Sequence, residues 1–188
     1  MKKVKLNDEN IHKGYLILIN PDNLLKTNEI KLISYSEKYK NIELDQVANS
    51  QLQKALKSIN ANDEIVPISG VRTFEEQKRL YTDSIIENGE EYTKKFVALP
   101  NASEHQTGLG IDMTSQSVVD KQRLVFGDTT EYKWVVENCA KYGFIVRFTE
   151  GTDGITGISH EPWHLRYVGK KVAKEIKDQN WTLEEYCL

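Results

Sequence analysis

The sequence has few cysteines and no pattern that would pair them. Its 188 residues include only two, Cys139 and Cys187, which lie far apart and form no CxxC motif. A disulfide framework is therefore excluded as the basis of the fold. Two reduced, unpaired thiols are expected, as is usual in the cytosol.

Long apolar runs are also missing. The run YLILI, residues 15–19, is shorter than the apolar core of a signal peptide, and NPDN follows it instead of a small-residue cleavage site. No segment approaches the roughly 20 apolar residues that a transmembrane helix needs. These absences predict a soluble protein that has no membrane anchor and is located in the cytoplasm.

The charge pattern excludes another class of protein. The net charge is only −3, and no basic stripe alternates with aromatic residues. Nucleic acid is therefore not expected as a partner. The lysines near the N-terminus and over residues 170–177 are interpreted as solvated surface. The length suits one domain with one core, so a single domain over residues 1–188 is expected.

The spacing of apolar residues predicts strands clustered between early and late helices. Strands are expected over residues 14–20, 64–70, 144–148 and 163–168, a short strand or turn over 108–113, and a loop over 149–157. Pro67 restricts the second strand to an edge, a bulge or a strand end. Helices are expected after Asp45, from Thr73, and over 90–96, 131–142 and 170–178. This order predicts an α+β fold with a mostly antiparallel central sheet flanked by helices.

Two of these helices have recognisable starts. Asp45 can cap a helix whose apolar face comprises Val47, Leu52, Leu56 and Ile59. Thr73 and Glu76 have the spacing of a capping box. On this second helix, Phe74, Gln77, Leu80 and Tyr81 are expected to fall on one face.

Two polar stretches contain the candidate chemistry. A catalytic zinc site needs three protein ligands and one open position. In SEHQTGLGIDM, two glycines between His105 and Asp112 let the backbone double back, so that both side chains can face one point. His164 could add a third ligand from the next strand. The residues alone leave another interpretation open, in which each is an ordinary surface or hydrogen-bonding group.

Two further residues could act on a substrate beside such a metal. Glu161 precedes His164 by three residues, so a turn at Pro162 is needed for both to face the site. There its carboxylate could take a proton from water and return it to the leaving amine. Arg72, just before the capping box, could stabilise an oxyanion or bind a carboxylate. It could equally be a surface residue paired with Glu75 or Glu76.

The order of these motifs resembles that of a known family. SEHQTGLGID is similar to the SxHxxGxxxD signature of the D-alanyl-D-alanine metallopeptidases, and EPWH is similar to their ExxH element. SGVRTFEEQKRLY resembles their arginine-bearing segment, so the resemblance covers residues 69–169. GFIVRF and EPWHLRYVG further resemble the VanY and VanXY branch that is associated with vancomycin resistance.

The resemblance implies a role for each matching residue. His105, Asp112 and His164 would bind Zn²⁺, and the fold would be the small α+β domain of these peptidases and of hedgehog proteins. Glu161 would be the catalytic base and acid, and Arg72 would stabilise the oxyanion. Ser103 would help to hold the substrate. His160 matches no role, and Gly110 stands where many members have alanine.

The resemblance also implies substrates. A VanXY-like protein would be a cytoplasmic D,D-dipeptidase and D,D-carboxypeptidase that acts on the D-Ala-D-Ala dipeptide and on UDP-muramyl pentapeptide. Their loss would leave precursors with another terminal residue, to which vancomycin binds poorly. Two alternatives share the fold. One is an L-alanyl-D-glutamate endopeptidase, and the other is a hedgehog-like module in which zinc is not catalytic.

Overall fold

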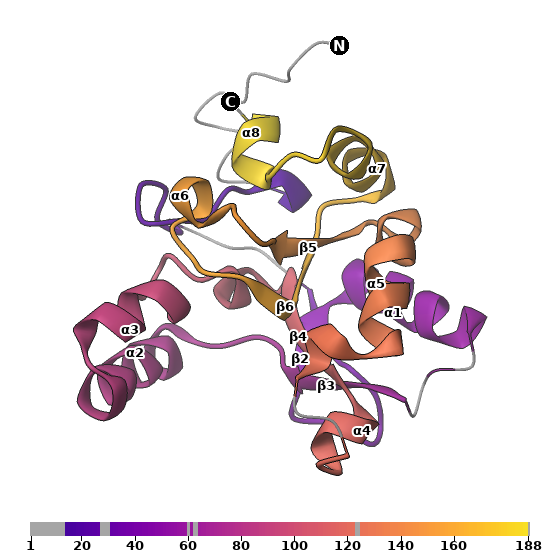
Figure 1. The fold of residues 1–188 in the computed structure, drawn as a ribbon, viewed down its shortest axis with the longest axis horizontal. Helices are drawn as coiled ribbons and strands as arrows, with labels where there is room; N and C mark the ends of the chain where they lie inside the picture. The colour runs from indigo at the N-terminus through magenta and orange to yellow at the C-terminus, as the bar shows by residue number, and fades with distance from the viewer. Residues whose placement is uncertain (1–13, 27–30, 60, 62–63, 123–124, 188) are drawn as a thin grey trace.

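The computed structural model describes residues 14–26, 31–59, 61, 64–122 and 125–187. In these ranges a four-stranded sheet runs through the middle of the molecule (Figure 1). Its strands are β3 (Ile65–Ser69), β4 (Gly110–Ser115), β6 (Glu161–Tyr167) and β5 (Phe144–Phe148), in that spatial order. All three neighbouring pairs are antiparallel, which confirms the predicted α+β class.

The strand that contains Pro67 lies at the edge of the sheet, as expected for a strand with a proline. β3 is an edge strand, and its register with β4 shifts between Pro67 and Ser69. Proline lacks the N–H that a central strand would need, so both the edge position and the irregularity follow from it. The two central strands, β4 and β6, contain three of the predicted site residues, Asp112, Glu161 and His164.

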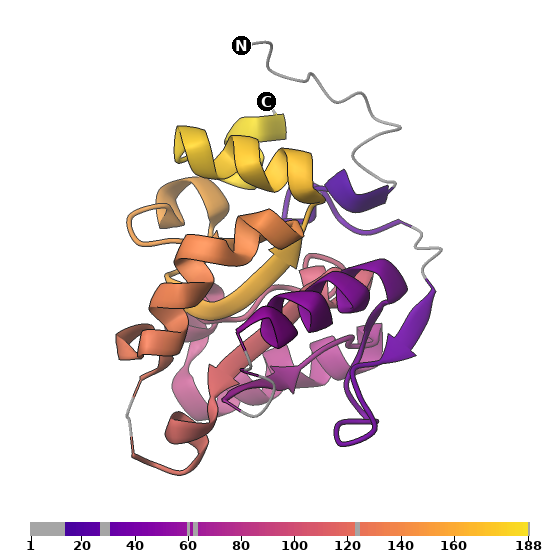
Figure 2. The ribbon, with the colours of Figure 1, turned by 90° about the vertical axis from the view of Figure 1, so that its right-hand side faces the viewer.

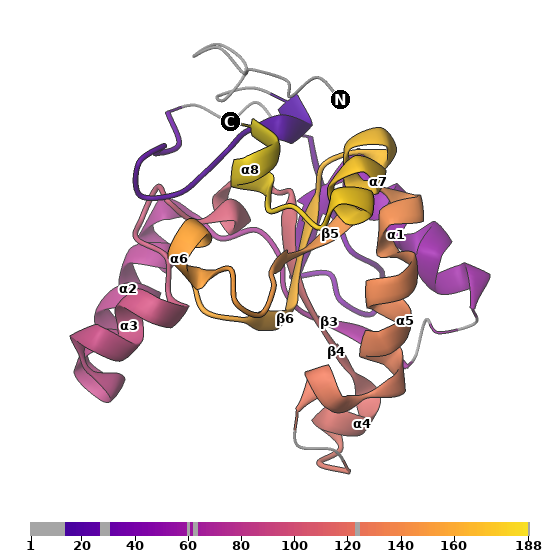
Figure 3. The same cartoon turned by 45° about the horizontal axis from the view of Figure 1, so that its top comes forward.

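Helices lie on two sides of the sheet, as Figures 1 and 3 show. The long α2 (Phe74–Asn88) and the short α3 (Glu90–Phe96) form a hairpin on one side, while α1 (Gln46–Ser58) and α5 (Thr130–Asn138) lie on the other. Two further short helices are α4 (Gln116–Val119) and α6 (Asp153–Thr156). Residues 149–157 are therefore not only a loop, because α6 forms within them. No helix among the described residues has the length and apolar character needed to cross a bilayer.

The predicted caps are confirmed. Asp45 accepts hydrogen bonds from the backbone N–H groups of Val47 and Ala48 and so starts α1. Thr73 and Glu76 form the reciprocal capping box of α2. After α5 the chain tightens into a 3-10 helix, Cys139–Tyr142, which Gly143 ends at φ 92°. Only glycine adopts such a conformation without strain.

The predicted apolar faces are partly wrong. Leu52 and Leu56 of α1 are buried, but Val47 is 41% exposed. On α2 both Phe74 and Leu80 are 42% exposed. The buried side chains of α2 are Gln77 and Ser84, because this helix packs on α3 and beside a cavity instead of against the sheet.

The strand predicted over residues 14–20 is also wrong. Gly14–Leu16 forms a 3-10 turn, and the following residues pair with no strand of the described sheets. A side chain takes the place of a neighbouring strand, since Arg166 donates hydrogen bonds to the carbonyl oxygens of Tyr15 and Ile17. Two antiparallel strands that were not expected, β1 (Leu32–Ser34) and β2 (Glu43–Asp45), form a second small sheet.

The C-terminal region has one helix more than expected. The predicted helix 170–178 is α7 (Lys170–Gln179), and a second helix, α8 (Leu183–Cys187), follows it. Figure 2 shows both beside the segment that begins at Gly14. Their contact is apolar: Leu18 of that segment shares one buried cluster with Ile176 of α7 and Leu183 of α8. Both cysteines are buried and unpaired, as predicted.

Candidate active site

His105 is held by the backbone of a distant segment. It lies in a 3-10 helix, Glu104–Thr107, that ends at Gly108 in the left-handed conformation. Its Nδ1 is 2.6 Å from the carbonyl oxygen of Gly70. Because a carbonyl can only accept, Nδ1 carries the proton, and Nε2 is left with a free lone pair that faces Asp112.

Gly70 is a residue whose importance the sequence did not reveal. A Cβ at this position would lie 2.2 Å from the carbonyl oxygen of Glu43 on β2. That oxygen also accepts a hydrogen bond from the backbone N–H of Val71, so β2 and this segment are locked together. The absent side chain therefore lets Gly70 reach both β2 and His105.

Asp112 and His164 are brought together by strand register. They are paired residues of β4 and β6, and Oδ1 of Asp112 is 2.9 Å from Nδ1 of His164. The same Oδ1 is 3.2 Å from Nε2 of His105. All three side chains are buried, and one donor atom from each lies within 4.8 Å of the others.

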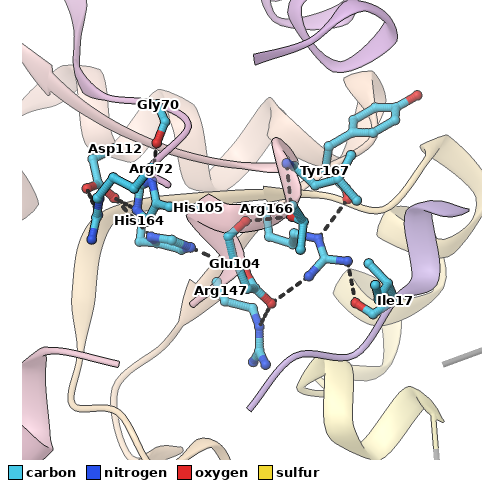
Figure 4. Close-up of polar contacts among 12 residues, drawn as sticks. Ile17, Gly70, Arg72, Glu104, His105, Asp112, Arg147, His164, Arg166 and Tyr167 are labelled. Atoms are coloured by element: carbon cyan, nitrogen blue, oxygen red, sulfur yellow. Dashed lines mark hydrogen bonds and ion pairs between the residues drawn. The ribbon is translucent and has the colours of Figure 1, made fainter. Parts of the chain in front are cut away.

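The outer nitrogen of His164 has its own partner, Glu104. Its Nε2 is 3.3 Å from Oε2 of Glu104, as Figure 4 shows. Burial lowers the pKa of His164, but the hydrogen bonds to Asp112 and Glu104 outweigh it and raise this pKa to about 9. The pocket therefore favours a positive charge between His164 and Asp112. Glu104 was not among the predicted site residues.

The donor set fits a zinc ion. Two imidazole nitrogens and one carboxylate oxygen are zinc ligands with bond lengths of about 2.0–2.2 Å. Tetrahedral angles then place ligand atoms roughly 3.3 Å apart, close to the 2.9 and 3.2 Å found around Asp112 Oδ1. Each imidazole also has a partner on its other nitrogen, which is the usual support of a metal-binding histidine.

Glu161 reaches the same site through a strand irregularity. Val146 of β5 pairs with Leu165 of β6. Phe148, two residues further along β5, pairs with Glu161, which is four residues from Leu165 where a regular ladder would have two. This bulge in β6, and not the predicted turn, allows Glu161 and His164 to line one cavity. Burial is the main cause that raises the pKa of Glu161 to about 7; the positive charges of His164 and Arg72 oppose the rise, and the negative charges of Asp112 and Glu104 add to it.

Arg72 points inward, so its predicted alternative as a surface partner of Glu75 or Glu76 is wrong. Its Nη1 donates to the side chain of Gln77 at 2.8 Å, and its Nη2 is 3.4 Å from Oδ2 of Asp112. Gln77 in turn donates to the carbonyl oxygen of Ala98 at 2.7 Å. The guanidinium group is thus fixed on one wall of the cavity.

One cavity of about 700 Å³ brings these groups together. Its lining includes all six predicted site residues: Arg72, Ser103, His105, Asp112, Glu161 and His164. The exposed side chain of Leu80 on α2 forms part of the same wall. His160 lies outside; it is exposed, and its Nε2 is 3.5 Å from the hydroxyl of Tyr132.

Gly110 occupies a tight position next to a predicted ligand. A Cβ there would lie 3.2 Å from Cε1 of His164 and 3.2 Å from the backbone carbon of Glu104. An alanine would therefore press on the imidazole ring by a few tenths of an ångström.

A fold with a buried two-histidine, one-carboxylate group beside a carboxylate and an arginine is typical of metallopeptidases. The family model described as "VanY: D-alanyl-D-alanine carboxypeptidase" matches residues 41–170. The chain therefore belongs to the VanY family of D-alanyl-D-alanine peptidases.

Relatives of known name agree with this family. The bifunctional D-Ala-D-Ala dipeptidase and carboxypeptidase VanXYC of Enterococcus gallinarum is 39% identical over 91% of this chain and 92% of its own length. The putative carboxypeptidase YodJ of Bacillus subtilis is 46% identical over 65% of this chain, and the match spans only 45% of YodJ.

Solved structures give the same result. The D,D-dipeptidase VanXYg, in complex with a D-Ala-D-Ala phosphinate analogue, matches with a TM-score of 0.86 and 38% identity. The match covers 98% of this chain and 74% of that one. A VanY mutant from a VanB-type resistance cassette, solved with Zn(II), matches with a TM-score of 0.79 and 30% identity, over 93% and 99% of the two chains.

The contact at Gly70 leads to a test of the metal site. Gly70→Ala should push β2 or the Gly70 carbonyl aside, because a Cβ would lie only 2.2 Å from Glu43 O. His105 then loses the acceptor of its Nδ1–H, and the affinity for zinc should fall by about 10–100-fold. Zinc titration of the metal-free protein measures this. Gly154→Ala is the control, because a Cβ there meets nothing within 4 Å. Equal zinc affinity in both variants would contradict the role given to Gly70.

Proposed function

We propose that this protein is a zinc-dependent D,D-peptidase. It hydrolyses D-Ala-D-Ala and removes the terminal D-Ala of peptidoglycan pentapeptide precursors, and in this way it contributes to vancomycin resistance. The observation that carries the proposal is the meeting of Arg72, Glu161 and the His105–Asp112–His164 group at one cavity. Location in the cytoplasm, where such precursors are made, is part of the same proposal.

Zinc is the proposed metal. His105, Asp112 and His164 would hold it. Two of the three donors are imidazole nitrogens, which favours zinc over magnesium or calcium, because those ions prefer oxygen ligands. A bound zinc ion supplies Lewis-acid chemistry, which polarises a peptide carbonyl and acidifies water. The relative that was solved with Zn(II) supports the same metal.

Glu161 is the proposed base and acid. A carboxyl group with a pKa of about 7 holds and releases a proton readily at neutral pH. Glu161 would accept the proton of the attacking water and deliver it to the amine of the departing D-Ala. Its burial keeps bulk water from competing for that proton.

Arg72 and Ser103 are proposed to contact the substrate. The guanidinium of Arg72 is fixed by Gln77 and Asp112, so a developing oxyanion would meet donors that are already in place. Ser103 lines the cavity with no side-chain hydrogen bond to the 3-10 helix that follows it. Its hydroxyl is proposed to hold the substrate.

An L,D-carboxypeptidase is a second candidate. It is favoured by the likeness to LdcB, described as an LD-carboxypeptidase, at 36% identity and a TM-score of 0.79 over 91% of this chain and 85% of that one. Both activities release a terminal D-Ala, but they differ in the chirality of the residue before it. The same zinc, base and arginine would serve either reaction.

One assay separates the candidates. The zinc-loaded protein is given D-Ala-D-Ala, UDP-muramyl pentapeptide, and the tetrapeptide precursor, whose terminal D-Ala follows an L-configured centre. Release of D-Ala from the first two, abolished by a chelator and restored by zinc, is expected. Release from the tetrapeptide alone would replace the D,D assignment with an L,D assignment. Inactivity toward all three would overturn the proposed peptidase.

Glu161→Gln tests the base. Glutamine has nearly the same shape but cannot accept a proton at neutral pH, so turnover of D-Ala-D-Ala should fall by about 10²–10⁴. Zinc content and melting temperature should stay at the wild-type values, because Glu161 is not one of the three proposed ligands. His164→Ala, by contrast, should lose zinc. Loss of zinc from Glu161→Gln would make Glu161 a ligand and refute its assignment as the base.

Arg72→Lys tests the oxyanion contact. Lysine keeps the charge but lacks the planar fork that reaches Gln77 and Asp112 together. Turnover should fall by about 10²–10³. Arg79→Lys is the matched control, since Arg79 is exposed on α2, where it pairs with Asp83 one turn further along the same helix. Equal turnover of the two variants would show that Arg72 has no part in the reaction.

A further inference from the structure

A buried network of charges lies behind His164. The carboxylate of Glu104 faces His164 with Oε2, while Oε1 accepts hydrogen bonds from Nε of Arg147 at 2.7 Å and from Nη1 of Arg166 at 2.6 Å. All of these side chains are at most 4% exposed. The contacts of Glu104 in Figure 4 therefore join the predicted ligand to two arginines of the central sheet.

Each arginine leads on to a terminal part of the chain. Arg147 on β5 holds Glu184 of α8 through two parallel hydrogen bonds, of 2.9 Å from Nη1 and 2.5 Å from Nη2. Arg166 on β6 binds the carbonyl oxygens of Tyr15 and Ile17, at 3.0 and 2.6 Å. Both ends lie outside residues 41–170, the part that matches the family model.

The charges of this network balance. Two carboxylates, Glu104 and Glu184, face two guanidinium groups, Arg147 and Arg166. If Glu184 were neutral, the cluster would carry one unbalanced positive charge. Arg147 would then have Glu104 as its remaining carboxylate partner, so less of the negative charge of Glu104 would be left to face His164. In a buried site such a charge is poorly screened, so it would also repel a nearby cation.

We infer that Glu184 is a positioning residue for the metal ligand His164. It acts through Arg147 and Glu104: Glu184 shares the charge of Arg147, which leaves Glu104 free to hold the Nε2–H of His164. This contact keeps Nδ1 of His164 directed at Asp112 and at the metal. The C-terminal helix α8 thus becomes part of the metal site although it does not line the cavity. The inference rests on the proposed metal site and not on which peptide is cleaved.

Zinc affinity of the metal-free protein tests the inference. Glu184→Gln keeps the shape and one acceptor but removes the charge. Because Glu184 acts through Glu104, the direct partner of the ligand, zinc binding should weaken by no more than the lower end of what loss of such a partner costs, about tenfold. Leu183→Ala is the matched control. Leu183 is the neighbouring residue on α8, is 0% exposed, and belongs to the apolar cluster. It should lower the melting temperature at least as much, while zinc affinity stays within about twofold.

A second substitution should change the zinc affinity in a direction that a purely structural role of Glu184 does not predict. Arg147→Met, added to Glu184→Gln, removes the unbalanced guanidinium, so Glu104 keeps Arg166 and again serves His164. The double variant should bind zinc more tightly than Glu184→Gln alone. If Glu184→Gln does not fold, Glu184→Asp replaces it, because the shorter side chain loosens the paired hydrogen bonds; a threefold or greater loss is then expected.

Three results would overturn the inference. These are zinc affinity of the Glu184 variant within twofold of the wild type, an equal loss in Leu183→Ala, or a double variant weaker than the single one. A wild-type protein that binds no zinc would instead refute the proposed function. The two failures are therefore distinguishable.

Discussion

The arrangement of the central sheet and of the site depends on the ion pairs that the buried carboxylate of Glu104 forms with Arg147 and Arg166. An isolated charge in the interior would cost several kcal/mol, so it must be paired. Its pairing with Arg147 and Arg166 requires β5 and β6 to lie side by side. Removing one partner of such a buried group costs about 3–5 kcal/mol, because the remaining charge is left unpaired. The requirement therefore favours one arrangement of the sheet.

The same carboxylate connects architecture with chemistry. Arg147 and Arg166 extend from it to α8 and to the segment at Tyr15, whereas the other oxygen of Glu104 faces His164. His105 is held in a similar way by the Gly70 carbonyl. Both imidazoles are thus oriented before any metal arrives, so little freedom is lost on binding, which is the usual advantage of a supported ligand.

The cavity has a divided character that suits a peptidase. Its inner wall contains the two imidazoles, Asp112 and Glu161, which are all buried. Its outer wall is the α2–α3 hairpin, where Leu80 is half-exposed and Gln77 reaches inward to Arg72. The polar groups of the inner wall would act on the reacting bond. The hairpin wall, where Leu80 and Phe96 stand beside the charged Asp83 and Lys94, would meet the rest of the substrate. This explains why α2 buries so few apolar residues although its sequence is amphipathic.

Local signals in the sequence predicted many of the helices and strands and pointed to the candidate ligands. Asp45 and the Thr73–Glu76 pair marked helix starts because a cap acts within a few residues, and Pro67 marked an edge strand because it lacks one donor. The six candidate site residues came from short motifs and from the resemblance of those motifs to a known family. Only the tertiary structure decided the partners of Glu104, the closeness of Gly70 to Glu43, the bulge that turns Glu161 inward, and the absence of the strand expected over residues 14–20.

A polar side chain can be satisfied by any donor or acceptor that the fold brings near. His105 and its partner Gly70 are 35 residues apart in the sequence, and Arg166 and its partner Ile17 are 149 apart. Arginines within the apolar strands FIVRF and WHLRYV were the one visible sign of the buried network, but their charge does not say which carboxylate they meet.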